Sequence, residues 1–418
     1  MSILNQLTKI INQLFGYGFS QLVVILLPII LLPILTRTLT IVEFADYSIY
    51  KTVLALSTPL ISFSLSTYLL KNFYSILKNE VNKFLINSSF YSLFITIIFI
   101  IISYILSNPI QEILKIDDFG VLMYAFVNTF LFAIHTLFLT VYRANSNIKQ
   151  FFITNFIVVL ITILGVLLIS YFEYINLRLV LLTHSVSYLI SILLGLLFFI
   201  KIKKDDISFD QTLIKNFIQF SIPLVLYSVF TQLYTGTDRM IINFFLSKSD
   251  LAIYAATFQI AFGVSAMGSV LQLAWTPYLF KKMSNTNKID FQTIQIIASI
   301  IVFMIFFSLA YYLLFPTLMK IFLPEQYFGG SNIFIWFIMA GFVQVLYWII
   351  NPFLIIYEKR SYLLYIAIVA ASINIVLNLI FTKNGIEYAA IIYFTTWIIQ
   401  CLGSIICVYY AKKNLPTT

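Results

Sequence analysis

The stretch Tyr234-Thr-Gly-Thr-Asp-Arg-Met-Ile-Ile-Asn-Phe-Phe-Leu-Ser-Lys-Ser-Asp-Leu-Ala-Ile-Tyr254 decides the fold. It places an acid and a base, Asp238 and Arg239, at or just inside the end of a long apolar run, where burying charge is costly. Its last five residues read acid, large apolar residue, Ala, any residue and Tyr. Residues Glu43–Tyr47 read the same way about half a chain earlier. These two elements predict that the chain consists of two similar halves.

The composition predicts an integral membrane protein. Of the 418 residues, 61% are hydrophobic and 10% are charged, and the mean hydropathy is +0.98. That apolar surface exceeds what a soluble core can hide. Cys401 and Cys407 lie without metal-ligand spacing in an apolar run, so they predict neither a disulfide framework nor a metal site.

Twelve apolar runs have the length of about 20 residues that a helix needs to cross a bilayer. They are residues 15–35, 47–70, 84–106, 121–142, 151–171, 179–200, 217–236, 255–279, 294–314, 333–353, 362–381 and 389–410. An even number of spans places both termini on one side. The termini and even-numbered loops hold 17 of the 25 lysines and arginines, so the positive-inside rule predicts cytoplasmic termini. The net charge of +9 is then a topology signal, and no nucleic-acid partner is needed to explain it.

A second internal match supports the repeat. Tyr68-Leu-Leu-Lys71 resembles Tyr278-Leu-Phe-Lys281 at an offset of 210 positions, and the two acid-to-Tyr elements are offset by 207. We therefore expect an all-α membrane protein with six-helix bundles at residues 1–207 and 208–418. Because six is even, the bundles are expected to be parallel repeats around a central cavity. The polar segment Lys201–Lys215 is expected to be the hinge between them.

Ionisable residues at membrane depth are the candidates for function. Arg239 is expected to face the cavity and meet an anion, with Asp238 orienting it. The alternative for this pair is a structural anchor at the outer interface. Lys51 and Arg37 would add positive charge to the outer half of the cavity. Lys51 has the alternatives of extending to the membrane surface or pairing with Asp46.

The two histidines, His135 and His184, lie within the fourth and sixth runs. Packing and hydrogen bonding within the helix bundle explain the presence of both histidines. The functional alternative is that they couple transport to protons. The four tryptophans are interpreted mainly as interfacial anchors. The sequence contains none of the motifs of P-loop proteins, zinc proteases or serine hydrolases, so we expect no enzyme and no resident cofactor. Coupling of transport to Na⁺ or H⁺ stays open.

Several short motifs are distributed over both halves of the chain, namely Leu35-Thr-Arg-Thr-Leu39, Phe44-Ala-Asp-Tyr47, Pro223, Thr237-Asp-Arg239, Leu251-Ala-Ile-Tyr254 and Leu273-Ala-Trp-Thr-Pro-Tyr278. Together they resemble the pattern of Wzx-type polysaccharide flippases, which belong to the multidrug/oligosaccharidyl-lipid/polysaccharide (MOP) exporter superfamily. The chain departs from the pattern at Asp46 and Ile253, where members often have Gly.

The resemblance implies a flippase of the bacterial inner membrane. Such a protein moves an undecaprenyl-pyrophosphate-linked oligosaccharide from the cytoplasmic to the outer leaflet, by alternating access, for O-antigen, lipopolysaccharide or capsule synthesis. Arg37, Lys51 and Arg239 would be counter-charges for the headgroup, and Arg143 would meet it at the cytoplasmic end of the fourth helix. Its partners would be the lipid-linked substrate, membrane lipids and other polysaccharide-assembly proteins.

Two other classes of transporter compete with the flippase. A cation-coupled multidrug or metabolite exporter of the same superfamily should have an acid deep in a helix, and Asp238 is the only acid placed near one. The major facilitator transporters also have six plus six helices. Their Gly-rich basic motif is absent from the segment Lys71–Lys83, which disfavours them.

Overall fold

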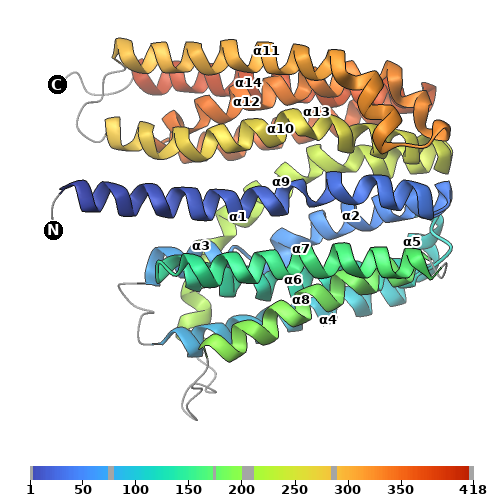
Figure 1. Ribbon diagram of the computed structural model, residues 1–418, viewed down its shortest axis with the longest axis horizontal. Coiled ribbons are helices and arrows are strands. Elements are labelled where there is room, and N and C mark those ends of the chain that lie inside the picture. Colours follow the sequence, from blue (N-terminus) through green and yellow to red (C-terminus); the bar gives the residue numbers. More distant parts are fainter. Residues whose placement is uncertain (1–2, 74–79, 173–175, 200–210, 284–289, 414–418) are drawn as a thin grey trace. The chain divides into compact units, whose positions relative to one another are not determined.

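The computed structural model describes residues 3–73, 80–172, 176–199, 211–283 and 290–413, and Figure 1 shows the course of the chain. These residues form α-helices and short 3-10 helices, with no strand among them. The elements are α1 (Ile3–Thr38), α2 (Ile41–Ser62), α3 (Leu65–Asn72), α4 (Val81–Ile105), α5 (Ser107–Leu114), α6 (Gly120–Ala144), α7 (Ile148–Tyr171), α8 (Leu177–Phe199), α9 (Gln211–Phe245), α10 (Lys248–Met283), α11 (Phe291–Phe322), η3 (Glu325–Asn332), α12 (Phe334–Ile356), α13 (Arg360–Phe381), η4 (Thr382–Asn384) and α14 (Ile386–Lys413). The predicted all-α class is confirmed.

Each of the twelve apolar runs coincides with helical structure, but the count of twelve spans is not confirmed. Among the described residues, ten helices are long and apolar enough to cross a membrane, or eleven if α2 and α3 form one span. These two helices meet at a 40° bend. The bend lies at Phe63 and Ser64, whose φ angles of 44° and 56° are left-handed and therefore interrupt the helix. In α1, the stretch Leu22–Thr38 is apolar but shorter.

The chain divides into two compact units. Unit 1 comprises residues 1–27 and 46–229, and unit 2 comprises residues 28–45 and 230–418. Helices α1, α2 and α9 therefore each contribute to both units. The predicted boundary at residues 207/208 and most of the predicted hinge Lys201–Lys215 lie outside the described residues, so the bundle boundaries stay a prediction.

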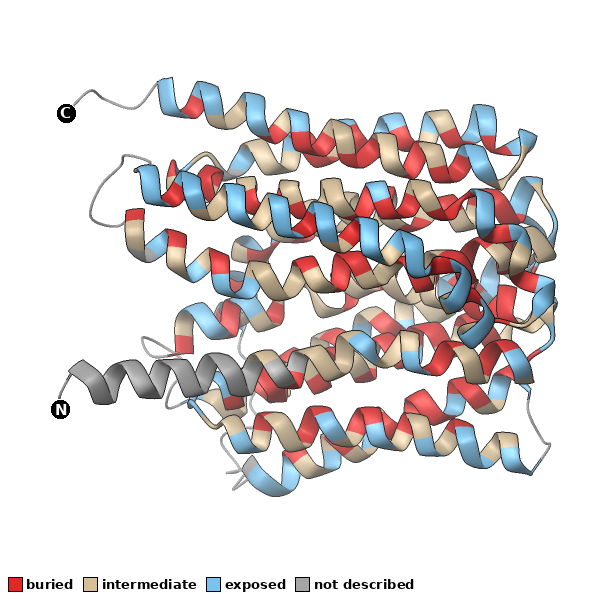
Figure 2. Ribbon diagram, turned by 45° about the horizontal axis from the view of Figure 1, so that its top comes forward, coloured by how far each residue is buried: buried red, intermediate tan, exposed pale blue. Residues whose placement is uncertain are grey.

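Each unit is organised around well-buried helices. In unit 1, α6 packs against α3, α4 and α8, and α7 packs against α8. In unit 2, α12 packs against α10 and α14. The spans of α6 and α10 are each 67% buried, compared with 11% for α11. Single helices have a buried and an exposed side, as Figure 2 shows.

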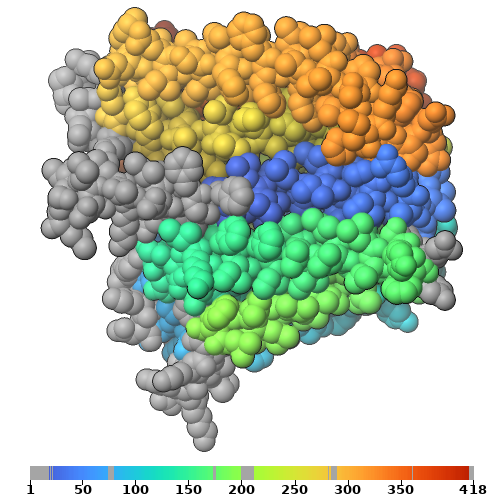
Figure 3. Space-filling model, in the orientation of Figure 1, coloured from blue at the N-terminus to red at the C-terminus, as the bar shows by residue number. Residues whose placement is uncertain are grey.

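The exposed sides of the outer helices are strongly apolar. On α11, Phe306 and Leu313 are 67% and 69% exposed, and on α7 Leu164 and Leu168 are also exposed. Figure 3 shows α11 in orange and α7 in teal on one face of their units. A surface of this composition is stable in hydrocarbon and would aggregate in water. The chain is therefore a multi-pass membrane protein.

The two repeat elements begin their helices in the same way. At the start of α2, the Glu43 carboxylate accepts hydrogen bonds from the Thr40 N–H (3.0 Å) and hydroxyl (2.9 Å), and the Glu43 N–H donates to Thr40 Oγ1. At the start of α10, Asp250 and Ser247 make the same three bonds. Both are capping boxes, which satisfy the free N–H groups of a helix start. Thr40 and Ser247 are thus the N-caps, and the acid of each repeat element completes the capping box.

Candidate functional site

Asp238 and Arg239 lie inside α9, two turns before its end at Phe245. The helix continues past residue 236, where the apolar run ends. The polar residues Thr235 and Thr237 ended the apolar pattern there, but their hydroxyls bond to the carbonyls of Thr231 and Leu233 one turn back, which is compatible with a continuous helix. The two charged residues therefore lie within the helix and not at its end.

Asp238 is fully buried and its carboxylate has partners for both oxygens. The hydroxyl of Tyr254, on α10, donates to Oδ2 at 2.5 Å. The Arg239 backbone N–H donates to Oδ1 at 2.8 Å, and the Arg239 guanidinium Nη1 lies 3.7 Å from the same atom. Adjacent residues on a helix need not pair, but here the long Arg239 side chain turns back toward Asp238. The structure thus brings Asp238 close to Arg239 and Tyr254, and the orienting role of Asp238 stays a prediction.

The Arg239 guanidinium rests on an aromatic ring. Its Cζ lies 4.4 Å from the centroid of Phe258, and its Nη1 donates to the Thr235 carbonyl at 3.2 Å. The side chain is 13% exposed. Because the ion pair with Asp238 is longer than a hydrogen bond, most of the five guanidinium N–H groups have no partner within the described chain. Arg239 is therefore a cation held in a largely apolar setting with donors to spare.

An aromatic cluster continues from Phe258 through the core of unit 2. Phe258 packs edge-on against Phe337 and Tyr393, and Tyr393 in turn contacts Trp397. Trp397 is only 2% exposed, so the interfacial interpretation is wrong for it. It is also wrong for Trp275, whose buried indole donates to the Ile349 carbonyl at 3.0 Å.

In unit 1, the repeat tyrosine Tyr47 joins two of the predicted site residues. Its hydroxyl is 3.3 Å from Nε2 of His184, on α8, and the two rings are stacked. The Lys51 ammonium lies 5.8 Å from the centre of the Tyr47 ring. The Lys51 side chain is half-buried, and the nearby His184 is buried. Tyr47 and Tyr254 occupy equivalent repeat positions but have different partners, a histidine and a carboxylate.

His135 lies in a second polar group of unit 1. Its Nδ1 is 2.6 Å from the hydroxyl of Ser191 on α8, and its ring lies beside that of Tyr188. Nearby on the same helices, the Asn128 amide donates to the Tyr50 hydroxyl and to the Leu181 carbonyl. These bonds fit the packing interpretation of the histidines, and proton coupling stays a prediction.

The other two predicted site residues lie at exposed helix ends. Arg37 closes α1, and its Nη2 donates to the Ile321 carbonyl at 2.8 Å, in the last turn of α11. Arg143 is exposed in the last turn of α6. The structure brings Asp238 together with Arg239, and Lys51 with His184. Arg37 instead caps a helix, and the role of all seven residues in binding or coupling stays a prediction.

Sequence reasoning missed the pairing of Tyr254 with Asp238, although a signal for it was present. Asp238 lies eight positions before Leu246 and Tyr254 eight positions after it. Leu246 lies in the short connection between α9 and α10. Residues equally far from the turn of a helical hairpin face each other when the turn is short. The described residues contain no group of three or more acids, histidines and cysteines that could hold a metal ion.

These features define a multi-helix membrane protein with a buried ion pair in unit 2. The model of the polysaccharide biosynthesis protein family matches residues 12–283, well over half of the chain. The chain belongs to this family. It is also 23% identical over 410 residues to Lsg locus putative protein 1 of Haemophilus influenzae, with 91% of this chain and 93% of that protein covered.

Two solved structures show the same fold. An inward-facing multidrug resistance MATE family transporter of the MOP superfamily matches with a TM-score of 0.69 and 13% identity, covering 94% of this chain and 96% of that chain. The lipid II flippase MurJ, in an inward closed conformation, matches with a TM-score of 0.72 and 15% identity, covering 96% and 87%. The family match bears out the resemblance to polysaccharide biosynthesis proteins, and these structures confirm the fold that the resemblance implied.

Proposed function

We propose that the protein moves an undecaprenyl-pyrophosphate-linked oligosaccharide from the cytoplasmic to the outer leaflet of a bacterial inner membrane, by alternating access, for O-antigen or capsule synthesis. The observation that carries this proposal is Arg239, a cation with spare donors inside the membrane-spanning helix α9. The family match and the lipid II flippase among the structures of similar fold support it.

The chemistry of Arg239 suits a pyrophosphate headgroup. Such a group cannot enter hydrocarbon without counter-charge, and a planar guanidinium can donate two parallel hydrogen bonds to phosphate oxygens. Asp238 does not neutralise Arg239 fully, because the carboxylate is shared with the Tyr254 hydroxyl and lies 3.7 Å from Nη1. Phe258 below the guanidinium fixes its plane. Arg239 is thus positioned for an anionic ligand.

The remaining assignments follow from the same proposal. Lys51 and Arg37 add positive charge along the path, and Arg143 meets the headgroup on the cytoplasmic side, where both termini lie. His135 and His184 are candidates for proton coupling. The substrate would come from, and pass to, other polysaccharide-assembly proteins of the membrane.

Deletion of the gene and complementation with Arg239 variants test this function. The deletion strain should accumulate an undecaprenyl-linked oligosaccharide, measured by mass analysis of lipid extracts. R239Q should fail to reverse the accumulation, and R239K should reverse it in part because it keeps the charge without the planar fork. R178Q is the matched control, since Arg178 pairs with Asp118 at an exposed helix start. Normal surface polysaccharide with R239Q at unchanged protein level would exclude the role of Arg239.

One observation favours a cation-coupled exporter of the same superfamily as the alternative. Asp238 is a fully buried acid inside a helix, as an exporter that exchanges a cation for its substrate requires. In that case the deletion strain should show unchanged lipids and new sensitivity to toxic compounds. D238N should then abolish resistance, measured as growth in the presence of those compounds.

A further inference from the structure

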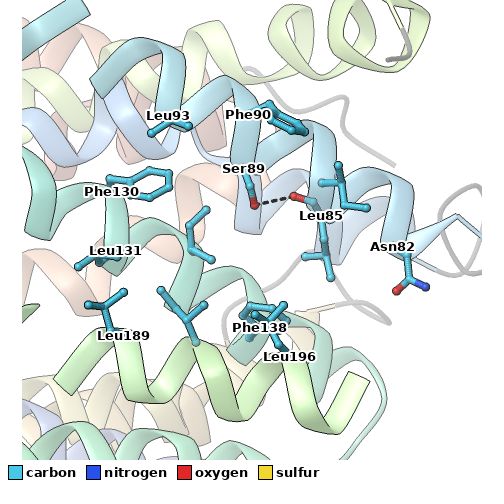
Figure 4. A pocket seen from close by; sticks show the side chains of 13 residues that line it. Asn82, Leu85, Ser89, Phe90, Leu93, Phe130, Leu131, Phe138, Leu189 and Leu196 are labelled. Atoms are coloured by element: carbon cyan, nitrogen blue, oxygen red, sulfur yellow. Dashed lines mark hydrogen bonds between the residues drawn. The ribbon is translucent and has the colours of Figure 1, made fainter. Parts of the chain in front are cut away.

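A recess of about 400 Å³ lies in unit 1 between α4, α6 and α8. Figure 4 shows side chains from the three helices converging on it. Its floor is made of α6 residues that are no more than 6% exposed, among them Leu131 and Phe138. Its rims carry exposed side chains, Phe90 on α4 and Leu189 on α8. The recess is therefore a groove with a packed floor, open on one side, and its volume is in the range of small-ligand sites.

The lining of the groove is apolar along its length. The Ser89 hydroxyl donates to the Leu85 carbonyl of its own helix at 2.7 Å, so it offers the groove no free donor (Figure 4). The remaining polar side chain is Asn82, in the first turn of α4, at one end of the groove. A ligand with a long apolar part and a polar end would match this distribution.

The open side of the groove is strongly apolar. Only 28% of the α4 span is buried within the protein, and Phe90 is 59% exposed, so this side of α4 is suited to contact with hydrocarbon. Along α4 the groove extends from Asn82 to Leu93, which at 1.5 Å per residue is roughly 16 Å, or about half of the apolar thickness of a bilayer. Its long axis therefore follows that of a lipid chain, with the Asn82 end at the membrane surface.

We infer that the groove holds a segment of the polyisoprenoid chain of the lipid-linked substrate, with the phosphate end near Asn82. The inference rests on the proposed function, and it concerns the stage at which the substrate enters from the cytoplasmic side, where Arg143 at the end of α6 is proposed to meet the headgroup. Between two apolar groups in a membrane, packing rather than the hydrophobic effect decides affinity. A chain that carries methyl branches offers more atoms for packing against the rings of Phe90, Phe130 and Phe138 than a straight acyl chain does.

Photolabelling of the purified protein tests this site. The probe is a polyprenyl phosphate with a diazirine on its chain, added to the full-length protein in nanodiscs of phosphatidylethanolamine and phosphatidylglycerol. Peptide mass spectrometry should find the label on α4, α6 and α8. Excess undecaprenyl phosphate should suppress the labelling, whereas an equal excess of phosphatidylglycerol should leave it unchanged.

Two variants and a matched control complete the experiment. S89F fills the middle of the groove and L189W narrows it from the exposed rim, so each should lower labelling about tenfold, which corresponds to a loss of 1.4 kcal/mol. S299F is the control, because Ser299 is an exposed serine of α11 with the same hydroxyl bond to the carbonyl four residues back. It should label as the unchanged protein does.

Three results would overturn the inference. The first is equal competition by phosphatidylglycerol, which would indicate an ordinary lipid site. The second is labelling on helices other than α4, α6 and α8. The third is equal labelling of S89F, L189W and S299F. The proposed function fails by a different result, a deletion strain with unchanged undecaprenyl-linked lipids. Because labelling is measured on purified protein and lipid accumulation in cells, a failure of the groove assignment is distinguishable from a failure of the proposed function.

Discussion

Asp238 shows how a single hydroxyl makes a buried carboxylate tolerable in a membrane-spanning helix. An acid without partners in hydrocarbon costs several kcal/mol, which would unwind the helix or exclude the residue from it. The Tyr254 hydroxyl and the Arg239 backbone N–H occupy both carboxylate oxygens. The acid can therefore remain at depth and hold the guanidinium next to it.

Removing this hydroxyl should destabilise unit 2. We expect Y254F to lower the free energy of unfolding by about 1–2 kcal/mol, because a buried oxygen of Asp238 loses its donor. Thermal unfolding in detergent measures the effect. Y311F is the control, since Tyr311 donates to the neutral carbonyl of Ile260 at 2.8 Å and should cost less.

A double-mutant cycle isolates the contact between the two residues. In a D238N background, the cost of Y254F should fall, because the neutral amide depends less on the hydroxyl than the carboxylate does. Additive effects of the two substitutions would contradict a direct interaction between Tyr254 and Asp238.

The residues of the candidate site could be named from the sequence, but their partners could not. Charge inside an apolar run identifies Asp238, Arg239 and Lys51 as unusual without any structure. Which side chain approaches each one depends on the rotation and crossing of helices, which a single sequence does not determine. The sequence also does not determine the surroundings of Trp397. Tryptophan is common at membrane interfaces, but packing places this one in the core of unit 2.

At the scale of the element, the two matching sequence elements of the repeat form the same structure, a capping box at the start of a helix. Thr40 with Glu43, and Ser247 with Asp250, satisfy the first N–H groups of α2 and α10. Each box follows a connection of only a few residues, so the cap fixes where the second helix of a hairpin starts. That start in turn sets the register that brings Tyr254 opposite Asp238.

Single substitutions should reveal the contribution of each cap to stability. We expect T40A and S247A each to lower the free energy of unfolding by about 1 kcal/mol, since an N-cap side chain accepts a bond that alanine cannot replace. Thermal unfolding in detergent is again the measurement. S299A removes a hydroxyl from the middle of α11 and should have little effect, because alanine is the better helix former there. A loss with S299A equal to the loss with T40A would contradict the capping role.

The hydrophobic pattern predicted the positions of the helices well, and their first and last residues less well. Every apolar run became a helix because the backbone of a spanning segment must satisfy its own hydrogen bonds. The ends of α9 and α10 extend past the apolar runs, since polar residues can continue a helix wherever a cap or neighbour supports it. The bend between α2 and α3 has no Gly or Pro at Phe63 and Ser64 themselves, and the local signal for it is Pro59, one turn earlier in α2.

At the scale of the whole molecule, the distribution of lysine and arginine predicts the orientation in the membrane. The turn after α6 and the connection between α11 and α12 are expected on opposite sides. N145C and S331C place a thiol at these two exposed positions, in a background in which Cys401 and Cys407 are replaced by Ser.

An impermeant thiol reagent added to intact cells should label only one of the two variants. We expect S331C to react from outside and N145C to react only after the membrane is opened, as measured by the mass shift of the purified protein. Labelling of N145C in intact cells would reverse the predicted orientation of both termini.

The assignment of residues 28–45 to unit 2 has a consequence for the synthesis of the protein. Thr36 and Arg37 donate to the carbonyls of Phe322 and Ile321, and Arg37 is 284 positions away from its partner. At 5–20 residues per second, the ribosome reaches that partner roughly 15 to 60 s after it has made Arg37. The end of the first helix must therefore wait in the membrane for most of translation. Factors that shelter an incompletely packed span would be most needed for this segment.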